Sequence, residues 1–225
     1  MTDSSVLVAP RDITDLAVEA AIEAAAVILD VYARPIHVVS KSDGSPVTEA
    51  DAAAEQVNIG LVEHGRPTMG VVLAPVTGEI FVGDANGAWT GRVVDGVVTE
   101  KRETKVGWLP RLRIVASRSH GHEALEKLCQ TLDVESDVSV GSSLKFCLLA
   151  RGDAQLYPRF TPTCEWDTAA GQAVLEAAGG AVVTLDGAPM RYGKHELSFL
   201  NPYFVAAASL ELAQKAAKEM QALLE

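Results

Sequence analysis

The sequence predicts a two-lobed α/β protein, with an α+β lobe in residues 1–108 and an α/β lobe in residues 109–225. Three observations lead to this class. A chain of 225 residues with 48% hydrophobic content can bury a sizeable core, in one domain or in two lobes. Apolar residues alternate with polar ones from Val57 onwards, as in antiparallel strands. After Arg111, strand-like and helix-like segments alternate, as in strand–helix units.

The amino-terminal lobe is predicted to open with a helix over residues 13–31, preceded by Asp12 as a capping residue. Its apolar positions have amphipathic spacing and are Ile13, Leu16, Ala17, Ala20, Ala21, Ala24, Val27, Ile28 and Val31. A second helix is predicted from Thr48, which forms a capping-box pattern with Asp51. Capping alone would account for Asp51.

An antiparallel meander is predicted next, with strands at Val57–Val62, Thr68–Leu73 and Glu79–Val82 and further strands around two later Asn-Gly and Asp-Gly turns. The change from helix to strand at Gln56 is abrupt, because no glycine or proline separates the two patterns. Connections in compact domains commonly take about 2 to 6 residues. We therefore expect that Gln56 and Val57 are not peptide-bonded neighbours in the folded protein.

The carboxyl-terminal lobe is predicted from alternating patterns after Arg111. Strands are expected at residues 112–117, 138–140, 152–158 and 181–185, and helices around residues 125–132, around residues 144–149 and from Glu211 to the end. The turn at residues 141–143 leads into the helix that carries Lys145 in its first turn. Such a turn can bind phosphate through backbone amides, but it is a weak signal on its own.

A short stretch at Glu165–Gly171 joins a polar turn to an alanine-rich helix that Gly179 and Gly180 end. Asp167 and Thr168 are both suited to cap this helix, and taken alone they favour that interpretation. A second interpretation adds a cation. Asp167 would then hold a divalent metal beside a helix N-terminus, whose partial positive charge favours a phosphate.

The letters Trp166, Asp167, Ala169, Ala170 and Gly171 match the signature W-D-x-A-A-G of the inositol monophosphatase superfamily, and this stretch resembles it in every fixed letter. Residues 45–51 resemble the family segment S-P-V-T-x-A-D. The resemblance implies a magnesium-dependent phosphatase with a layered αβαβα sandwich of the sugar-phosphatase type. It also implies that Asp167 binds Mg²⁺ and that Asp51, beside the catalytic metals, orients the attacking water.

Three further segments, residues 117–120, 141–145 and 157–159, look most like the 3'(2'),5'-bisphosphate nucleotidases of that superfamily, the CysQ type. That resemblance implies hydrolysis of the 3'-phosphate of adenosine 3',5'-bisphosphate, with contacts to the nucleotide from His120, Ser142, Lys145 and Arg159. The residue types alone allow other interpretations. His120 and Arg159 suit a surface, Lys145 a solvated helix and Ser142 a plain cap.

Two metal motifs of the family, an E-E pair and D-P-x-D-G-T, are missing between the segments matched by Asp51 and by Val57. A magnesium phosphatase needs several oxygen ligands, so Asp167 with Asp51 is not enough. We favour a segment of a few tens of residues that the recorded sequence lacks. The alternatives are an inositol monophosphatase and a catalytically inactive nucleotide-binding protein.

Composition narrows the kinds of ligand, cysteine site and cellular location that we expect for this protein. A net charge of -11 argues against binding a nucleic-acid polymer, but it allows a small anionic substrate at a site loaded with metal. Cys129, Cys147 and Cys164 lack metal-site or disulfide spacing and are expected to be buried hydrophobes. No signal peptide or transmembrane segment is recognisable, so we expect a soluble cytoplasmic protein. The sequence leaves the oligomeric state open.

Overall fold

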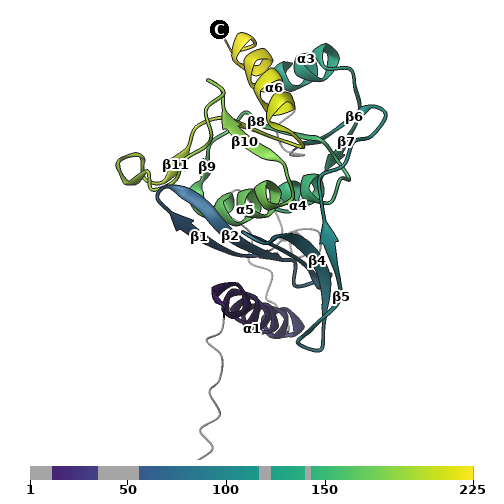
Figure 1. The fold of residues 1–225 in the computed structure, drawn as a ribbon, viewed down its shortest axis with the longest axis vertical. Helices are drawn as coiled ribbons and strands as arrows, with labels where there is room; N and C mark the ends of the chain where they lie inside the picture. Colours follow the sequence, from purple (N-terminus) through teal and green to yellow (C-terminus); the bar gives the residue numbers. More distant parts are fainter. Residues whose placement is uncertain (1–11, 35–55, 117–122, 140–142, 225) are drawn as a thin grey trace, which may run out of the picture.

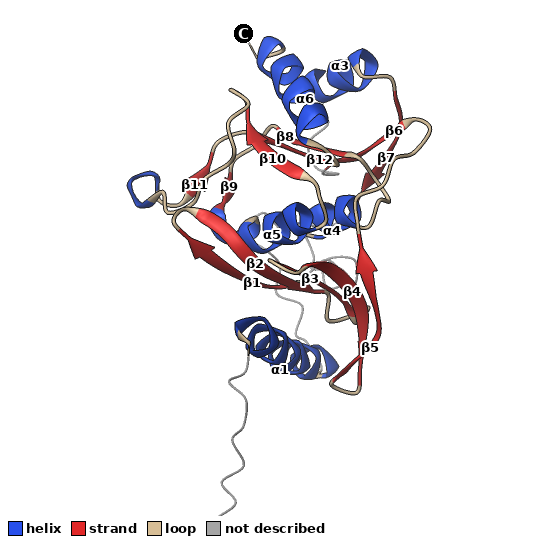
Figure 2. Cartoon of the chain, viewed as in Figure 1, coloured by secondary structure: helices blue, strands red, loops and turns tan. Residues whose placement is uncertain are grey.

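The computed structural model describes residues 12–34, 56–116, 123–139 and 143–224. These parts form five layers in the order helix, sheet, helix, sheet, helix (Figures 1 and 2). The outer helices are α1 (Ile13–Ala33) on one side and α3 (Glu123–Thr131) with α6 (Leu210–Ala222) on the other, and the inner ones are α4 (Leu144–Ala150) and α5 (Ala169–Ala177). The predicted αβαβα sandwich is confirmed. In the described part of the chain, no helix combines the length and the hydropathy needed to span a bilayer.

The first sheet is an antiparallel meander, which confirms the prediction for this part of the chain. Its strands are β1 (Val57–Glu63), β2 (Arg66–Leu73), β3 (Glu79–Asp84), β4 (Gly87–Val94) and β5 (Val97–Thr104), in chain order. Gln56 immediately precedes β1. The helix predicted from Thr48 lies outside the described residues.

The second sheet is mixed, in the order β10-β12-β8-β6-β7. Its strands are β6 (Leu112–Ala116), β7 (Val134–Ser139), β8 (Leu156–Arg159), β10 (Ala181–Thr184) and β12 (Phe204–Ala207), with β6 parallel to β7 and β8. The strand predicted at residues 152–158 starts later than expected. Gly152 has a φ of +82° and lies against Gly107 in a turn, so extended pairing begins only at Leu156. β7 begins earlier than predicted, at Val134.

α1 confirms the predicted helix and its cap, since Asp12 Oδ1 accepts a hydrogen bond from the Thr14 amide at 3.3 Å. The predicted apolar face is only partly correct. The side chains buried against the sheet are small ones, Thr14, Ala17, Ala21 and Ala25, whereas Leu16, Val27 and Val31 are exposed. Alanines face the sheet because they allow the helix backbone to pack closely on it.

A row of glycines crosses the inner face of the first sheet and determines where α5 lies. Gly60 pairs with Gly70, and Gly70 pairs with Gly83. A Cβ atom added at Gly70 would lie 2.2 Å from the carbonyl oxygen of Ala170, and one at Gly83 would lie 2.6 Å from the Val174 Cα. Only glycine permits this approach of helix and sheet, so the row sets the position of α5 and of the turn before it.

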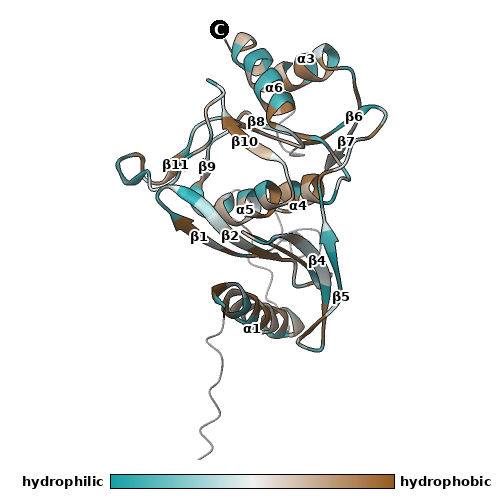
Figure 3. Cartoon of the chain, viewed as in Figure 1, coloured by the Kyte–Doolittle hydropathy of each residue, from teal (hydrophilic) through white to brown (hydrophobic). Residues whose placement is uncertain are grey.

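Between the sheets, α4 and α5 are packed in one hydrophobic core with the aromatic rings of Phe146, Tyr157 and Phe204. The rings of Phe146 and Tyr157 meet edge to face at 5.3 Å between centroids. Hydrophobic colouring dominates α4, whereas α6 on the outside alternates between the two colours (Figure 3). Of the three cysteines, Cys147 is buried as expected, but the other two are half-buried.

Candidate active site

Asp167 lies in a short 3-10 turn, η1 (Glu165–Asp167), directly before α5. Its Oδ2 accepts a hydrogen bond from the Cys164 amide at 3.2 Å, and the hydroxyl of Ser143 donates to its carbonyl oxygen at 3.1 Å. Thr168 occupies the cap position of α5 without a side-chain cap bond. Thr168 is therefore the N-cap of α5 by position only, and Asp167 caps the η1 turn instead of α5. Within the described residues, the other carboxylate oxygen of Asp167 has no hydrogen-bond partner.

Residues far apart in the sequence meet at Asp167. The amide of Ser143 donates to Oε1 of Gln56 at 3.3 Å, and the hydroxyl of the same serine bonds to the Asp167 carbonyl. Gln56 is the residue before the abrupt junction, so the start of β1 lies next to the candidate metal ligand. Ser143 is 1% exposed and joins the two elements. Sequence reasoning singled out its neighbour Ser142, which lies outside the described residues.

Lys145 is the second residue of α4 and is only 2% exposed, which contradicts the picture of a solvated helix lysine. Its ammonium lies 5.5 Å from the centre of the Tyr157 ring. Burial lowers the pKa of Lys145 to about 8, and repulsion from Arg159 contributes in the same direction. A charge buried in this way is stabilised when an anion binds beside it.

Arg159 lies two residues after Tyr157 on β8, so the two side chains share one face of the strand. The Arg159 guanidinium donates to the carbonyl oxygens of Thr161 at 3.1 Å and Pro162 at 3.4 Å. Burial raises the pKa of the Tyr157 hydroxyl, the charge of Arg159 opposes this rise and that of Asp167 adds to it. The phenol therefore lies within electrostatic range of both charges.

The four side chains Asp167, Lys145, Arg159 and Tyr157 thus form one group at the junction of η1, α4 and β8. Among the described residues, neither Lys145 nor Arg159 forms an ion pair with a carboxylate. Two cations that pair with no described carboxylate, next to a carboxylate whose second oxygen has no partner among the described residues, can bind an anion and a cation side by side. Tyr157 was missed as a separate site residue, although the Tyr157-Pro158-Arg159 motif contained it.

The candidate residues fit a magnesium ion in kind but are few in number. Mg²⁺ commonly binds through one or two carboxylates, water and substrate phosphate, and Asp167 supplies one such oxygen. The described parts of the chain contain no cluster of three or more His, Cys, Asp or Glu side chains suited to a metal. Asp51, the second carboxylate implied by the resemblance, lies outside them, as does His120.

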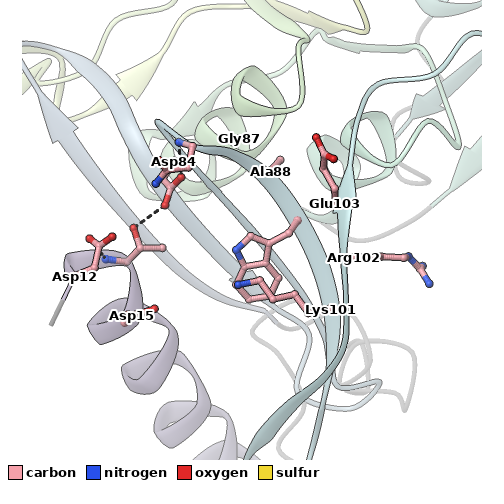
Figure 4. Close-up of a pocket in the computed structure, with 11 residues that line it drawn as sticks. Asp12, Asp15, Asp84, Gly87, Ala88, Lys101, Arg102 and Glu103 are labelled. Carbon is pink, nitrogen blue, oxygen red and sulfur yellow. Dashed lines mark hydrogen bonds between the residues drawn. The ribbon is translucent and has the colours of Figure 1, made fainter.

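A cavity of about 410 Å³ lies elsewhere, at the start of α1 (Figure 4). Asp12, Asp84 and Glu103 line it together with Lys101, which lies over the Trp89 ring at 4.2 Å. Figure 1 shows α1 and α5 on opposite faces of the first sheet. This cavity is therefore not part of the group around Asp167.

Comparison with known proteins agrees with the fold and identifies the protein family. The model of the inositol monophosphatase family matches residues 56–225. The 3'(2'),5'-bisphosphate nucleotidase CysQ of Escherichia coli O157:H7 is 37% identical over 232 aligned positions, which include 79% of this chain and 92% of that protein. Because 79% of 225 residues is about 178, about 54 of those positions contain no residue of this chain.

Two solved structures are similar over most of their length. The crystal structure of CysQ from Bacteroides thetaiotaomicron, described as a bacterial member of the inositol monophosphatase family, has a TM-score of 0.72 and 29% identity, covering 87% of this chain and 97% of its own. The inositol monophosphatase of Anabaena sp. PCC 7120 has a TM-score of 0.67 at 21% identity, covering 93% and 95%, and supports the fold alone. The match over residues 56–225 and the shared layers together establish that the chain belongs to the inositol monophosphatase family.

Proposed function

We propose that this chain is a magnesium-dependent phosphomonoesterase that removes the 3'-phosphate of adenosine 3',5'-bisphosphate. That it is a phosphatase follows from its family and from relatives that are bisphosphate nucleotidases. The nucleotide substrate is supported by one observation above all. Two cationic side chains, Lys145 and Arg159, lie without carboxylate partners in the described structure, next to the candidate metal ligand.

The roles of the side chains follow from where they lie. Lys145 and Arg159 bind phosphate oxygens, and the anion offsets the cost of keeping the ammonium buried. The two backbone carbonyls that accept from Arg159 hold its guanidinium without neutralising it. Tyr157 supports Lys145 through its ring face. We assign Ser142 and His120 to the nucleotide as well, by the resemblance of their segments to the nucleotidases.

Asp167 would hold Mg²⁺ through its free carboxylate oxygen, with Asp51 supporting the attacking water. When bound there, the ion supplies positive charge that offsets the negative charge of the phosphate, and it activates water. The substrate phosphate would lie between this carboxylate and the two cations. The Ser143 hydrogen bond to the Asp167 backbone keeps α4 and η1 together. It thereby maintains the spacing between the Asp167 carboxylate and the two cationic side chains.

Full activity requires more metal ligands than the described residues provide. The aligned positions that this chain lacks relative to the Escherichia coli nucleotidase support a missing internal segment, and the family match begins at Gln56. Its natural place is next to the Gln56 side chain, which contacts Ser143 beside Asp167. The absent metal motifs favour a second candidate, an inactive nucleotide-binding protein, if the 225 residues are the whole chain.

The test is a Mg²⁺-dependent activity panel on adenosine 3',5'-bisphosphate and inositol 1-phosphate, with Asp167→Asn as the variant. We expect the wild type to prefer the nucleotide and the variant to lose activity, since an amide lacks the negative charge of a metal ligand. Folding should survive, because Asn can still accept from the Cys164 amide. A folded variant that kept most of its Mg²⁺-dependent activity would exclude Asp167 as the metal ligand.

A further inference from the structure

A network of hydrogen-bonded polar side chains runs along α5, from the first sheet to the turn that holds Asp167. Arg66 on β2 pairs with Glu176 on α5, at 3.0 Å between Nη2 and Oε2. The Gln172 Nε2 donates to the other Glu176 oxygen at 2.8 Å, and the Tyr192 hydroxyl lies 2.8 Å from the Gln172 Oε1. Gln172 is fully buried and Tyr192 is 7% exposed. The bond between Tyr192 and Gln172 therefore satisfies groups with little or no access to water, whereas the Arg66–Glu176 pair at the other end is partly exposed.

This hydrogen-bond network ends at Thr168, the residue after Asp167. The Tyr192 hydroxyl lies 3.1 Å from the Thr168 Oγ1, which also accepts from the Asn201 Nδ2 at 2.9 Å. The Thr168 Oγ1 lies 3.2 Å from the Glu165 carbonyl oxygen, at the start of the same turn. Thr168 is 2% exposed. The Thr168 hydroxyl thus connects η1, the strand β11 (Leu200–Asn201) and the hydrogen-bond network along α5.

Tyr192, in the middle of the network, also bonds to the first sheet through its backbone. The Tyr192 amide donates to the Gly65 carbonyl in the β1–β2 turn at 3.1 Å, and Arg66 follows immediately. The turn with Asp167 is therefore joined to β2 by hydrogen bonds as well as by the packing of α5 on the glycine row. Arg66 Nε and Asn201 Oδ1 have no hydrogen-bond partner among the described residues, whereas the hydroxyls of Tyr192 and Thr168 are each bonded on two sides. Loss of either hydroxyl would leave another buried polar group unsatisfied, so the two hydroxyls restrict the positions of the groups around them.

We infer that Thr168 and Tyr192 are positioning residues, which hold the backbone of η1 so that the Asp167 carboxylate keeps one orientation. The inference rests on the proposed function only in taking Asp167 as the metal ligand. Asp167 makes a single side-chain hydrogen bond in the described structure, to the Cys164 amide. Its own contacts are too few to fix the carboxylate, so the neighbouring hydroxyls supply the constraint.

The test compares Thr168→Val, which keeps the shape and removes the hydroxyl, with Thr168→Ser, which keeps the hydroxyl. Tyr192→Phe removes the next hydroxyl in the chain. Tyr203→Phe is the matched control, because Tyr203 packs against the other core cluster beneath α6. Two quantities are measured besides the melting temperature. They are hydrogen–deuterium exchange over residues 163–169 in the metal-free protein and Mg²⁺ affinity by calorimetry.

We expect faster exchange of the Cys164 amide and about tenfold weaker Mg²⁺ binding in Thr168→Val and Tyr192→Phe, as is usual when an outer partner of a metal ligand is lost. Thr168→Ser and Tyr203→Phe should behave as the wild type. The inference is overturned if Thr168→Val or Tyr192→Phe folds and keeps wild-type exchange and affinity, even with a lower melting temperature. If Asp167→Asn binds Mg²⁺ as the wild type does, the proposed function fails, while the exchange measurement still decides the positioning role.

Discussion

Replacing Lys145 with Met should make the protein more stable while removing its nucleotide binding. The side chain is 2% exposed, and its pKa is lowered from 10.5 to about 8 by burial and by Arg159. A pKa difference of one between the folded and the unfolded state corresponds to about 1.36 kcal/mol. The buried charge therefore lowers the free energy of unfolding by about 3 kcal/mol at pH 7. Met has a similar length and no charge. We therefore expect a gain of up to about 3 kcal/mol, or a melting temperature about 6 to 12 °C higher in a domain of this size.

The pH dependence of this gain has a definite sign. Below pH 8 both the folded and the unfolded wild type hold the proton, so the full cost of burial is present. Between about 8 and 10.5 the folded state loses the proton while the unfolded state keeps it, and the stability of the wild type therefore rises with pH. The advantage of Lys145→Met should shrink across this window and vanish near its upper end.

Denaturant unfolding of both proteins at pH 7, 9 and 10 measures the difference directly. Lys218→Met, on the exposed side of α6, is the matched control and should show no such gain. A variant no more stable than the wild type at pH 7, or a difference independent of pH, would refute the buried-charge reasoning. Calorimetry with adenosine 3',5'-bisphosphate should show binding to the wild type alone.

Three other outcomes are expected. Arg159→Ala should reduce turnover of adenosine 3',5'-bisphosphate far more than any residual inositol phosphate turnover, because its guanidinium serves the nucleotide, and equal losses would count against that role. Gly70→Ala should destabilise the fold by about 1 to 3 kcal/mol or more and clearly more than Gly60→Ala, since the added Cβ would lie 2.2 Å from the Ala170 oxygen in the first case and 3.1 Å from its nitrogen in the second; equal effects in thermal unfolding would contradict the close approach of α5. Intact mass of the natural protein should exceed 23.8 kDa by several kilodaltons if a segment is missing between Gln56 and Val57, and a mass equal to that of the 225 residues would favour the inactive binding protein.

Local pattern in the sequence was enough to predict most of the elements, whereas Asp167 as a metal ligand was a prediction from the resemblance to the family. Alternation of apolar residues predicted the meander, and the small residues after Asp167 predicted α5. Both signals lie within spans of a few residues, where periodicity and turn chemistry act. The abrupt change at Gln56 was also visible there, because no glycine or proline separates the helical from the strand pattern.

Other properties depend on residues that meet only when the chain folds. The residue type alone suits Lys145 to a solvated helix position, and only the packing of α4 against β8 buries its charge beside Tyr157 and Arg159. The Asp167 carboxylate bonds back to Cys164 instead of capping α5, because η1 turns the chain before the helix begins. Burial and the electric field at a side chain are sums over neighbours distant in sequence, so tertiary structure alone determines them.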